Sequence, residues 1–240
     1  MNNHHRNLVR LRAVASALAE LNEKVVFVGG ATVSLYATDS AAVESRPTDD
    51  IDVVIEVATY AEFNSQINSR LLQLGFINDI TSKFIYRYKI HGSTIDVITV
   101  DIMPNDFDIL GFSNHWYKAG VAQSILYSID NRQSIRILTA PYFIATKLEA
   151  FNSFRHGEDA RGNPDFEDII YVFDNRNELL EEINQSLNSV RSYLQLEMNR
   201  LLAGPNVHEN IYVHLEPNTA SRRTERILKI WQAIAGQGDS

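Results

Sequence analysis

The sequence predicts an α+β fold in which a mixed sheet is followed by a helical C-terminal lobe. Short apolar strands separated by turns occur up to about residue 138, and helical periodicity dominates from Thr139 onward. The chain has 240 residues, which is enough for one large domain or for two smaller domains that share an interface. We expect an α/β domain over residues 1–138 and a helical domain over residues 139–240.

Apolar periodicity places the elements of the first domain. Leucines and an alanine at helical spacing predict an opening helix over residues 7–22. A second amphipathic helix is expected over residues 60–74, and Gly75 supplies its stop. Strands are predicted over six segments, which are residues 25–28, 51–56, 83–90, 94–100, 123–129 and 134–138.

The second domain is predicted to be helical. Pro141 stands at a position that the first turn of a helix tolerates. Residues 177–202 show one long apolar stripe, and Gly204-Pro205 marks a break. After this break we expect a loosely attached tail or a final helix over residues 219–235. Its basic residues form either a basic surface or a solvated helix face, and they are Arg222, Arg223, Arg226 and Lys229.

Two aspartates at the start of an apolar strand are the most informative feature for function. Side chains alternate across a strand, so Asp50 and Asp52 point to one face while Ile51 and Val53 fill the other. Adjacent carboxylates repel each other unless a cation lies between them, and a hard divalent cation takes oxygen ligands of this kind. The alternative is that Asp49 and Asp50 belong to a solvated turn and that Asp52 only borders the strand.

A second feature is the glycine pair that follows the strand at residues 25–28. Gly29 and Gly30 permit positive φ and let a ligand approach the backbone closely, and a helix is expected to follow them. The pattern is neither a Walker-type loop nor a dinucleotide-binding motif, so it is either a phosphate site or an ordinary turn. Farther along, Asp96 interrupts an apolar strand, where a buried carboxylate needs a cation or hydrogen-bond donors.

Together these features resemble a known pattern. A glycine-glycine turn before a helix, paired aspartates on the next strand and a third aspartate on a later strand are similar to nucleotidyltransferases of the polymerase-β type. With Arg46-Pro47-Thr48 and the segments 141–151 and 165–172, the chain resembles the AbiEii family of nucleotidyltransferase-like proteins over roughly residues 24–175. That family includes toxins of type IV toxin–antitoxin systems, and the MenT toxins are its relatives.

The resemblance implies a polymerase-β-like fold and an enzyme that transfers a nucleotidyl group from an NTP such as ATP. It implies dependence on Mg²⁺ or Mn²⁺ and, in the toxins, often a tRNA acceptor. Asp50 and Asp52 would bind the metal, and Asp96 would be a third ligand or a general base. The helical domain would complete the catalytic site with Lys147 and Asp168. Nucleotide contacts are expected from Gly29, Gly30, Thr32, Ser34, Arg46, Thr48 and Lys147.

Several of these assignments have a structural alternative. Lys147 lies on an apolar helix and suits a triphosphate as a point charge, but its stem could instead cover core surface. Asp168 could pair with Lys147 or Arg155, which would make a structural salt bridge. Arg46 and Thr48 either contact phosphate or shape the turn before the acidic pair.

Composition narrows the functional class. Because cysteine is absent, a disulfide framework, thiol-ligated zinc and a cysteine nucleophile are excluded. A formal net charge of −8 argues against broad nonspecific binding of nucleic acid, but not against a local basic surface. The sequence lacks an apolar run of about 18 residues and an apolar signal core after its first residues. We therefore expect a cytoplasmic protein without a membrane span.

Together with the AbiEii resemblance, these features lead us to expect a Mg²⁺-dependent nucleotidyltransferase, and the resemblance implies a role as a toxin or phage-defence protein. Its expected partners are an NTP, an RNA acceptor such as tRNA, and a cognate antitoxin protein. Two other functions remain open, namely a nucleotidyltransferase that modifies a small molecule such as an antibiotic, and a noncatalytic module that binds nucleotide or a partner protein. Retention of the acidic positions and of Lys147 favours an enzyme.

Overall fold

The structure is a computed structural model, and it describes residues 3–82, 86–91, 97–106, 114–153, 157 and 159–236. The chain forms two compact units. The first consists of Met1–Thr32 and Arg46–Thr139, and the second of Val33–Ser45 and Ala140–Ser240. Residues 33–45, which the sequence-based division at residue 138 left in the first domain, therefore group with the C-terminal helices.

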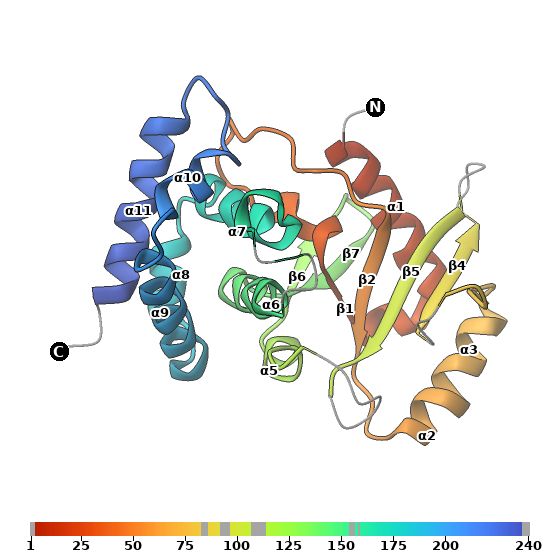
Figure 1. Cartoon of the computed structure of the whole chain (residues 1–240). Coiled ribbons are helices and arrows are strands. Elements are labelled where there is room, and N and C mark those ends of the chain that lie inside the picture. The colour runs from red at the N-terminus through yellow and green to blue at the C-terminus, as the bar shows by residue number, and fades with distance from the viewer. Residues whose placement is uncertain are drawn as a thin grey trace. The chain divides into compact units, whose positions relative to one another are not determined.

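A mixed sheet forms the first unit (Figure 1), and its strand order within the described residues is β3-β4-β5-β2-β1-β7-β6. β2 pairs antiparallel with β1 and parallel with β5, while β1 pairs parallel with β7. The outer neighbours pair antiparallel. The strands are β1 (Val25–Val28), β2 (Asp50–Ile55), β3 (Ile77–Asn78), β4 (Arg87–His91), β5 (Val97–Pro104), β6 (Ile125–Ser128) and β7 (Ser134–Ile137).

The central strands are apolar because both of their faces are covered. All four residues of β1 are buried, and β2 continues from its aspartates into buried Val53, Val54 and Ile55. β-Branched residues pack well in such interior strands. The two half-buried aspartates of β2 therefore lie where this strand begins, and the rest of the strand anchors them in the core.

The helices of the first unit follow the predicted amphipathic patterns. α1 (Asn3–Leu18) lies behind β2 and β5 in the view of Figure 1 and contacts both strands. It continues as a short 3₁₀ helix over Ala19–Glu23. The second predicted helix consists of α2 (Tyr60–Glu62), a π-helical turn (Phe63–Ile67) and α3 (Asn68–Gln73). α5 (Tyr117–Ala122) was not predicted.

The second unit is helical within the described residues. The long helix predicted over residues 177–202 is two helices, because the backbone is extended at Ser186 and the Ser186 hydroxyl donates to the carbonyl of Ile183. The final helix lies where the sequence predicts it. The helices are α6 (Ala140–Asn152), α7 (Pro164–Asn175), α8 (Leu179–Gln185), α9 (Asn188–Leu202), α10 (Val207–Tyr212) and α11 (Ala220–Ala235), with a 3₁₀ turn at Ala160–Gly162. Across the described residues, we find no helix with the length and apolar character needed to cross a membrane.

An aromatic cluster joins three helices of this unit. Trp231 of α11 is fully buried, and its ring lies edge-on to Phe166 and Phe173 of α7 at centroid distances of 6.3 and 5.7 Å. Phe166 also contacts Phe151 of α6, with 5.1 Å between the ring centroids. Edge-on aromatic pairs add to the large apolar area that such rings bury. α11 is therefore an integral part of the second unit and not a loosely attached tail.

We expect Trp231→Ala to lower the free energy of unfolding of the second unit by about 3–5 kcal/mol, because it removes a large buried ring and leaves a cavity. The measurement is urea denaturation followed by circular dichroism. Lys229→Ala, an exposed position on the same helix, is the control and should change stability by no more than about 0.5 kcal/mol. Similar denaturation midpoints for the two variants would contradict the proposed packing role of α11.

Candidate active site

Three carboxylates converge on one side of the sheet in the first unit. Asp50 and Asp52 lie on β2, and the parallel register places Asp101 of β5 directly beside Asp52. Within the described residues, one oxygen of each carboxylate lies within 4.8 Å of the others. Asp101 is buried, while Asp50 and Asp52 are half-buried. The predicted aspartate pair of β2 is therefore joined by a third carboxylate from the neighbouring strand.

This set of donors fits a hard divalent cation such as Mg²⁺ or Mn²⁺. Oxygen ligands lie about 2.1 Å from Mg²⁺ and therefore roughly 3–4 Å from one another, which the spacing of the three carboxylates permits. Carboxylates held this close favour a cation among them. Asp50, Asp52 and Asp101 are thus the residues that would hold the metal.

Asp101 was missed by the sequence analysis. The predicted strand ended at residue 100, whereas β5 continues to Pro104. The alternation that could have identified Asp101 is visible in the sequence, because Thr99 and Asp101 alternate with the buried Val100. Asp96, which was predicted for the same role, lies outside the described residues, so its role stays a prediction.

Gly29 leaves the space that the Asp52 carboxylate occupies. Val28 is the register partner of Asp52, and the chain then turns at Gly29 with a φ of +71°. A Cβ on Gly29 would lie 2.1 Å from Asp52 Oδ2. Both the backbone conformation and the available space therefore require glycine at this position.

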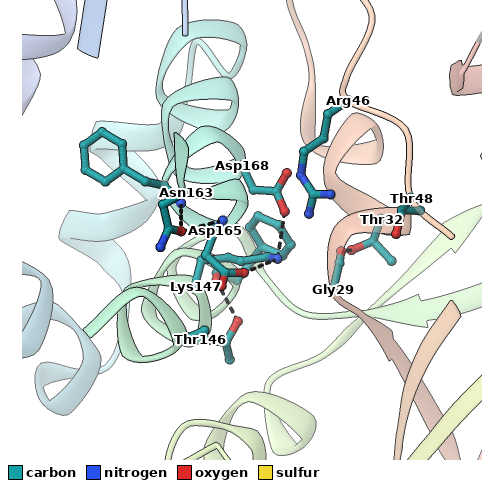
Figure 2. Close-up of polar contacts among 12 residues, drawn as sticks. Gly29, Thr32, Arg46, Thr48, Thr146, Lys147, Asn163, Asp165 and Asp168 are labelled. Atoms are coloured by element: carbon teal, nitrogen blue, oxygen red, sulfur yellow. Dashed lines mark hydrogen bonds and ion pairs between the residues drawn. The ribbon is translucent and has the colours of Figure 1, made fainter. Parts of the chain in front are cut away.

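The turn is held by Thr32, and the helix expected after it is a 3₁₀ helix over Gly30–Tyr36. The Thr32 amide and hydroxyl both donate to the Gly29 carbonyl, at 3.2 and 2.9 Å (Figure 2). Ser34 lies in this 3₁₀ helix and is buried. The nucleotide contacts expected from Thr32 and Ser34 stay predictions.

Arg46 and Thr48 lie over Gly30. A Cβ on Gly30 would lie 2.7 Å from Arg46 Nη2 and 3.4 Å from Thr48 Oγ1. The Thr48 hydroxyl also donates to Asp50 Oδ1 at 3.3 Å, which orients the first carboxylate of the cluster. Both residues therefore lie beside the glycine turn, and their contact with phosphate stays a prediction.

Arg10 of α1 fixes the backbone that leads into β2. Its Nη1 donates to the carbonyl of Thr48 at 2.7 Å, and its Nη2 donates to the carbonyl of Asp49 at 2.5 Å. A guanidinium that bonds two successive carbonyls fixes the direction of the turn. Arg10 was not selected from the sequence, because a single arginine on a helix gives no indication of a partner 38 residues away.

Arg87 of β4 provides a positive charge beside the carboxylates. It lies opposite Asp101 in the antiparallel register of β4 and β5. Its Nε and Nη2 donate to the two oxygens of Asp101 at 2.7 and 2.6 Å, and Nη2 also lies 3.3 Å from Asp50 Oδ2. The hydrogen bonds to Asp101 raise the pKa of the Arg87 guanidinium above its ordinary value, against the effect of burial.

In the second unit, Lys147 of α6 lies between two aspartates of α7 (Figure 2). Its Nζ is 2.9 Å from Asp165 Oδ1 and 2.7 Å from Asp168 Oδ2. The side chains are 8, 11 and 1% exposed respectively, so this is a buried ion cluster. Burial alone would lower the pKa of the Lys147 ammonium, but the charges of Asp168 and Asp165 outweigh it and hold that pKa above its ordinary value.

The start of α7 orients both aspartates. Asn163 caps the helix, since its Oδ1 accepts the amides of Asp165 and Phe166 at 2.9 and 3.1 Å. Asp168 lies three positions after Asp165, so both side chains share one helix face. The salt bridge that the sequence analysis considered for Lys147 and Asp168 is present, and Asp165 is an additional partner. The phosphate-binding role of Lys147 stays a prediction based on the resemblance.

Two of the four basic residues of α11 form ion pairs within the second unit. Arg223 Nη1 and Arg226 Nη2 donate to the two carboxylate oxygens of Asp174 at 2.6 and 2.8 Å. The Asp174 side chain is 4% exposed. Arg222 and Lys229 are exposed. The negative charge of a buried aspartate therefore partly balances the positive charge of these basic residues.

The sheet, its glycine turn and the helical second unit define a nucleotidyltransferase-like fold, which confirms the predicted α+β class. The chain is similar to the crystal structure of an antigenic nucleotidyltransferase-like protein from Paracoccidioides brasiliensis. The TM-score is 0.52 at 18% sequence identity, and the match covers 85% of this chain and 91% of that chain. An identity this low shows a shared fold and nothing finer. Neither a protein-family model nor a curated protein sequence matches the chain.

Replacing Gly29 with alanine should weaken binding of Mn²⁺, because a Cβ would displace the Asp52 carboxylate. The left-handed backbone should also cost about 1–2 kcal/mol of stability. Gly75→Ala is the matched control, since Gly75 has a φ of +89° and no atom within 4 Å of a built Cβ. Calorimetric titration with Mn²⁺ should show weaker binding in Gly29→Ala alone. Equal affinity in both variants would exclude close packing between Gly29 and the metal ligand.

Lys147→Met should destabilise the second unit by about 3–5 kcal/mol, because it leaves buried carboxylates without their counter-charge. Adding Asp168→Asn should restore part of this loss, since the second change removes one stranded charge. The exposed pair Lys118–Asp106 supplies the control, and Lys118→Met should cost less than about 1 kcal/mol. The test is a comparison of urea midpoints. A Lys147→Met protein as stable as the wild type would show that the cluster is not structural.

Proposed function

We propose that this chain is a divalent-metal-dependent nucleotidyltransferase that moves a nucleotidyl group from an NTP to a hydroxyl group of an RNA acceptor. The observation that supports this most strongly is the convergence of Asp50, Asp52 and Asp101, with Asp52 packed against Gly29, in a nucleotidyltransferase-like fold. The RNA acceptor, with tRNA as the first choice, and a role as a toxin of a toxin–antitoxin or phage-defence system follow from the AbiEii resemblance. A cognate antitoxin protein is part of this proposal.

Each group around the carboxylates has a function in such a reaction. Asp50, Asp52 and Asp101 would hold the cation, which when bound neutralises phosphate charge and stabilises the transition state at the α-phosphorus. Asp52 occupies the side-chain space of Gly29 and Arg46 that of Gly30, so a candidate metal ligand and a guanidinium border the backbone of the glycine turn. The Arg46 guanidinium, which lies over Gly30, adds a positive charge beside that backbone.

The bonding changes are those of an in-line displacement. The acceptor hydroxyl oxygen forms a bond to the α-phosphorus, the bond between that phosphorus and the oxygen bridging to the β-phosphate breaks, and pyrophosphate leaves. The hydroxyl proton passes to a carboxylate of the site. Both oxygens of Asp101 already accept short hydrogen bonds from Arg87, at 2.7 and 2.6 Å. We therefore assign the proton to Asp50 or Asp52.

An RNA acceptor has to be bound with little help from long-range attraction. The chain has a formal net charge of −8, and Arg223 and Arg226 are engaged with Asp174. Binding of nucleic acid through few phosphate contacts depends only weakly on salt concentration. We therefore expect recognition of a short, local segment of the acceptor, with a shallow dependence on salt.

The test is transfer of label from α-³²P-labelled NTPs to total RNA, to purified tRNA and to small hydroxylated compounds in the presence of Mg²⁺ or Mn²⁺. Asp52→Asn and Asp101→Asn should each lower the transfer rate at least about 100-fold, because each removes a charged ligand that acts in the transition state. Asp49→Asn, an exposed neighbour, should retain the wild-type rate. Circular dichroism checks that all variants are folded.

The outcomes separate the candidate functions. Labelled RNA that disappears with the two ligand variants supports the proposal. Label on small hydroxylated compounds but not on RNA would replace the acceptor with a small molecule. An NTP-dependent rise in melting temperature without transfer to any acceptor would indicate a noncatalytic nucleotide-binding module and would overturn the proposed activity.

A further inference from the structure

We propose that Arg87 controls metal binding by the carboxylate cluster. It makes tight binding of the divalent cation dependent on a bound nucleoside triphosphate. The proposal rests on the proposed function, and it concerns how the metal site of that enzyme is loaded. In the metal-free protein, the guanidinium provides positive charge that a divalent cation would otherwise supply. A free cation would then bind weakly, and a cation accompanied by a triphosphate would bind well.

The position of Arg87 follows from the register of three neighbouring strands. Arg87 on β4 is paired with Asp101 on β5, and Asp101 is paired with Asp52 on β2. Side chains at paired positions point to the same face of a sheet. The Arg87 guanidinium also reaches across β5, since its Nη2 is 3.3 Å from Asp50 Oδ2. Arg87 therefore contacts carboxylates on both metal-binding strands.

The charge balance explains why a free cation binds weakly. Three carboxylates carry three negative charges, and Arg87 reduces the net charge of the cluster to about −2 when all four groups are ionised. An incoming divalent cation meets both a smaller attraction and a like charge that already lies among its ligands. Arg87 is only 26% exposed and Asp101 is 8% exposed, so water screens this repulsion less than it would on an open surface.

The lengths of the contacts that Arg87 makes indicate which of them breaks when the metal binds. The bidentate pair with Asp101, at 2.6 and 2.7 Å, is the stronger kind of contact, whereas the contact of Arg87 with Asp50 is a single one at 3.3 Å. Release of Asp50 frees a carboxylate oxygen, and Asp101 retains unused lone pairs on both oxygens. Arg87 thus stays on Asp101 and lies near the cation.

A triphosphate removes the resulting conflict between the two positive charges. Its negative charge attracts both the cation and the guanidinium, so nucleotide and metal each strengthen the binding of the other. Such a coupling has the same magnitude for both ligands by thermodynamic linkage. A residue that only held Asp101 in place would behave differently, because its loss would disorder a ligand and weaken metal binding.

The experiment is titration of the full chain with Mn²⁺ alone, followed by calorimetry or by electron paramagnetic resonance, and then with α,β-methylene-ATP present. Arg87→Gln should bind Mn²⁺ alone at least about ten-fold more tightly than the wild type, because a competing charge within a few ångströms is gone. The analogue should strengthen Mn²⁺ binding less in Arg87→Gln than in the wild type. Mn²⁺ binding as weak as, or weaker than, that of the wild type would overturn the proposal.

Two further variants separate charge from structure. Lys89→Gln removes one positive charge from the same strand and the same face of β4, where Lys89 pairs with Asp79 at 3.0 Å. It should leave the Mn²⁺ affinity close to that of the wild type. Arg87→Lys keeps the charge without the bidentate contact, and it should also retain the weak Mn²⁺ binding. If Arg87→Lys increased the Mn²⁺ affinity as much as Arg87→Gln, the argument that the charge of Arg87 weakens metal binding would be contradicted.

Asp52→Asn distinguishes failure of this inference from failure of the proposed function. If Asp52→Asn abolishes Mn²⁺ binding in the wild-type background while Arg87→Gln has no effect, the metal site stands and the role of Arg87 is wrong. If the Asp52 change leaves Mn²⁺ binding unaltered in both backgrounds, the carboxylate cluster is not the metal site. Both the proposed function and the role of Arg87 are then overturned.

Discussion

The candidate site depends on the parallel pairing of β2 with β5. This register sets Asp52 beside Asp101, and the period of two along β2 adds Asp50 to the same face. A shift of one residue would move Asp101 to the opposite face of the sheet and would disperse the cluster. The apolar residues between the aspartates prevent such a shift, because they are buried in the core. The packing of the core therefore also determines the geometry of the candidate metal ligands.

Both units contain aspartates whose side chains are buried or half-buried. In each unit, a basic side chain from a neighbouring helix or strand partly balances their negative charge. In the first unit, Arg87 bonds Asp101 and Asp50 from an adjacent strand and stays partly exposed. In the second, Lys147 is enclosed between Asp165 and Asp168. The difference in burial matters, because a partly exposed cluster can admit a further cation, whereas an enclosed one mainly contributes to the stability of its fold. The first arrangement suits a functional site better.

The fold class, most of the strands and the Asp50–Asp52 pair could be predicted from the sequence because they depend on local periodicity. Asp101 could not be selected in the same way, because its importance comes from a register with β2 that no local pattern specifies. The same reason applies to Arg10 and Arg87, whose partners lie 38 and 14 residues away. Lys147 was identified, but its second partner depends on where α7 begins, which the Asn163 cap determines. Local rules identified the elements, and long-range pairing determined which side chains meet.

The candidate metal ligands and the Lys147 ion cluster belong to different units. Asp50, Asp52, Asp101, Gly29 and Arg87 all belong to the first unit, whereas Lys147 and its aspartates belong to the second. Changes in the first cluster should therefore appear mainly in the affinity for metal, and changes in the second mainly in unfolding. Sites without shared partners usually contribute additively to stability. Strong energetic coupling between Asp52 and Lys147 variants that arises only when Mg²⁺ and NTP are present would mean that ligand binding brings their functions together, and it would be the direct argument for a role of Lys147 in nucleotidyl transfer.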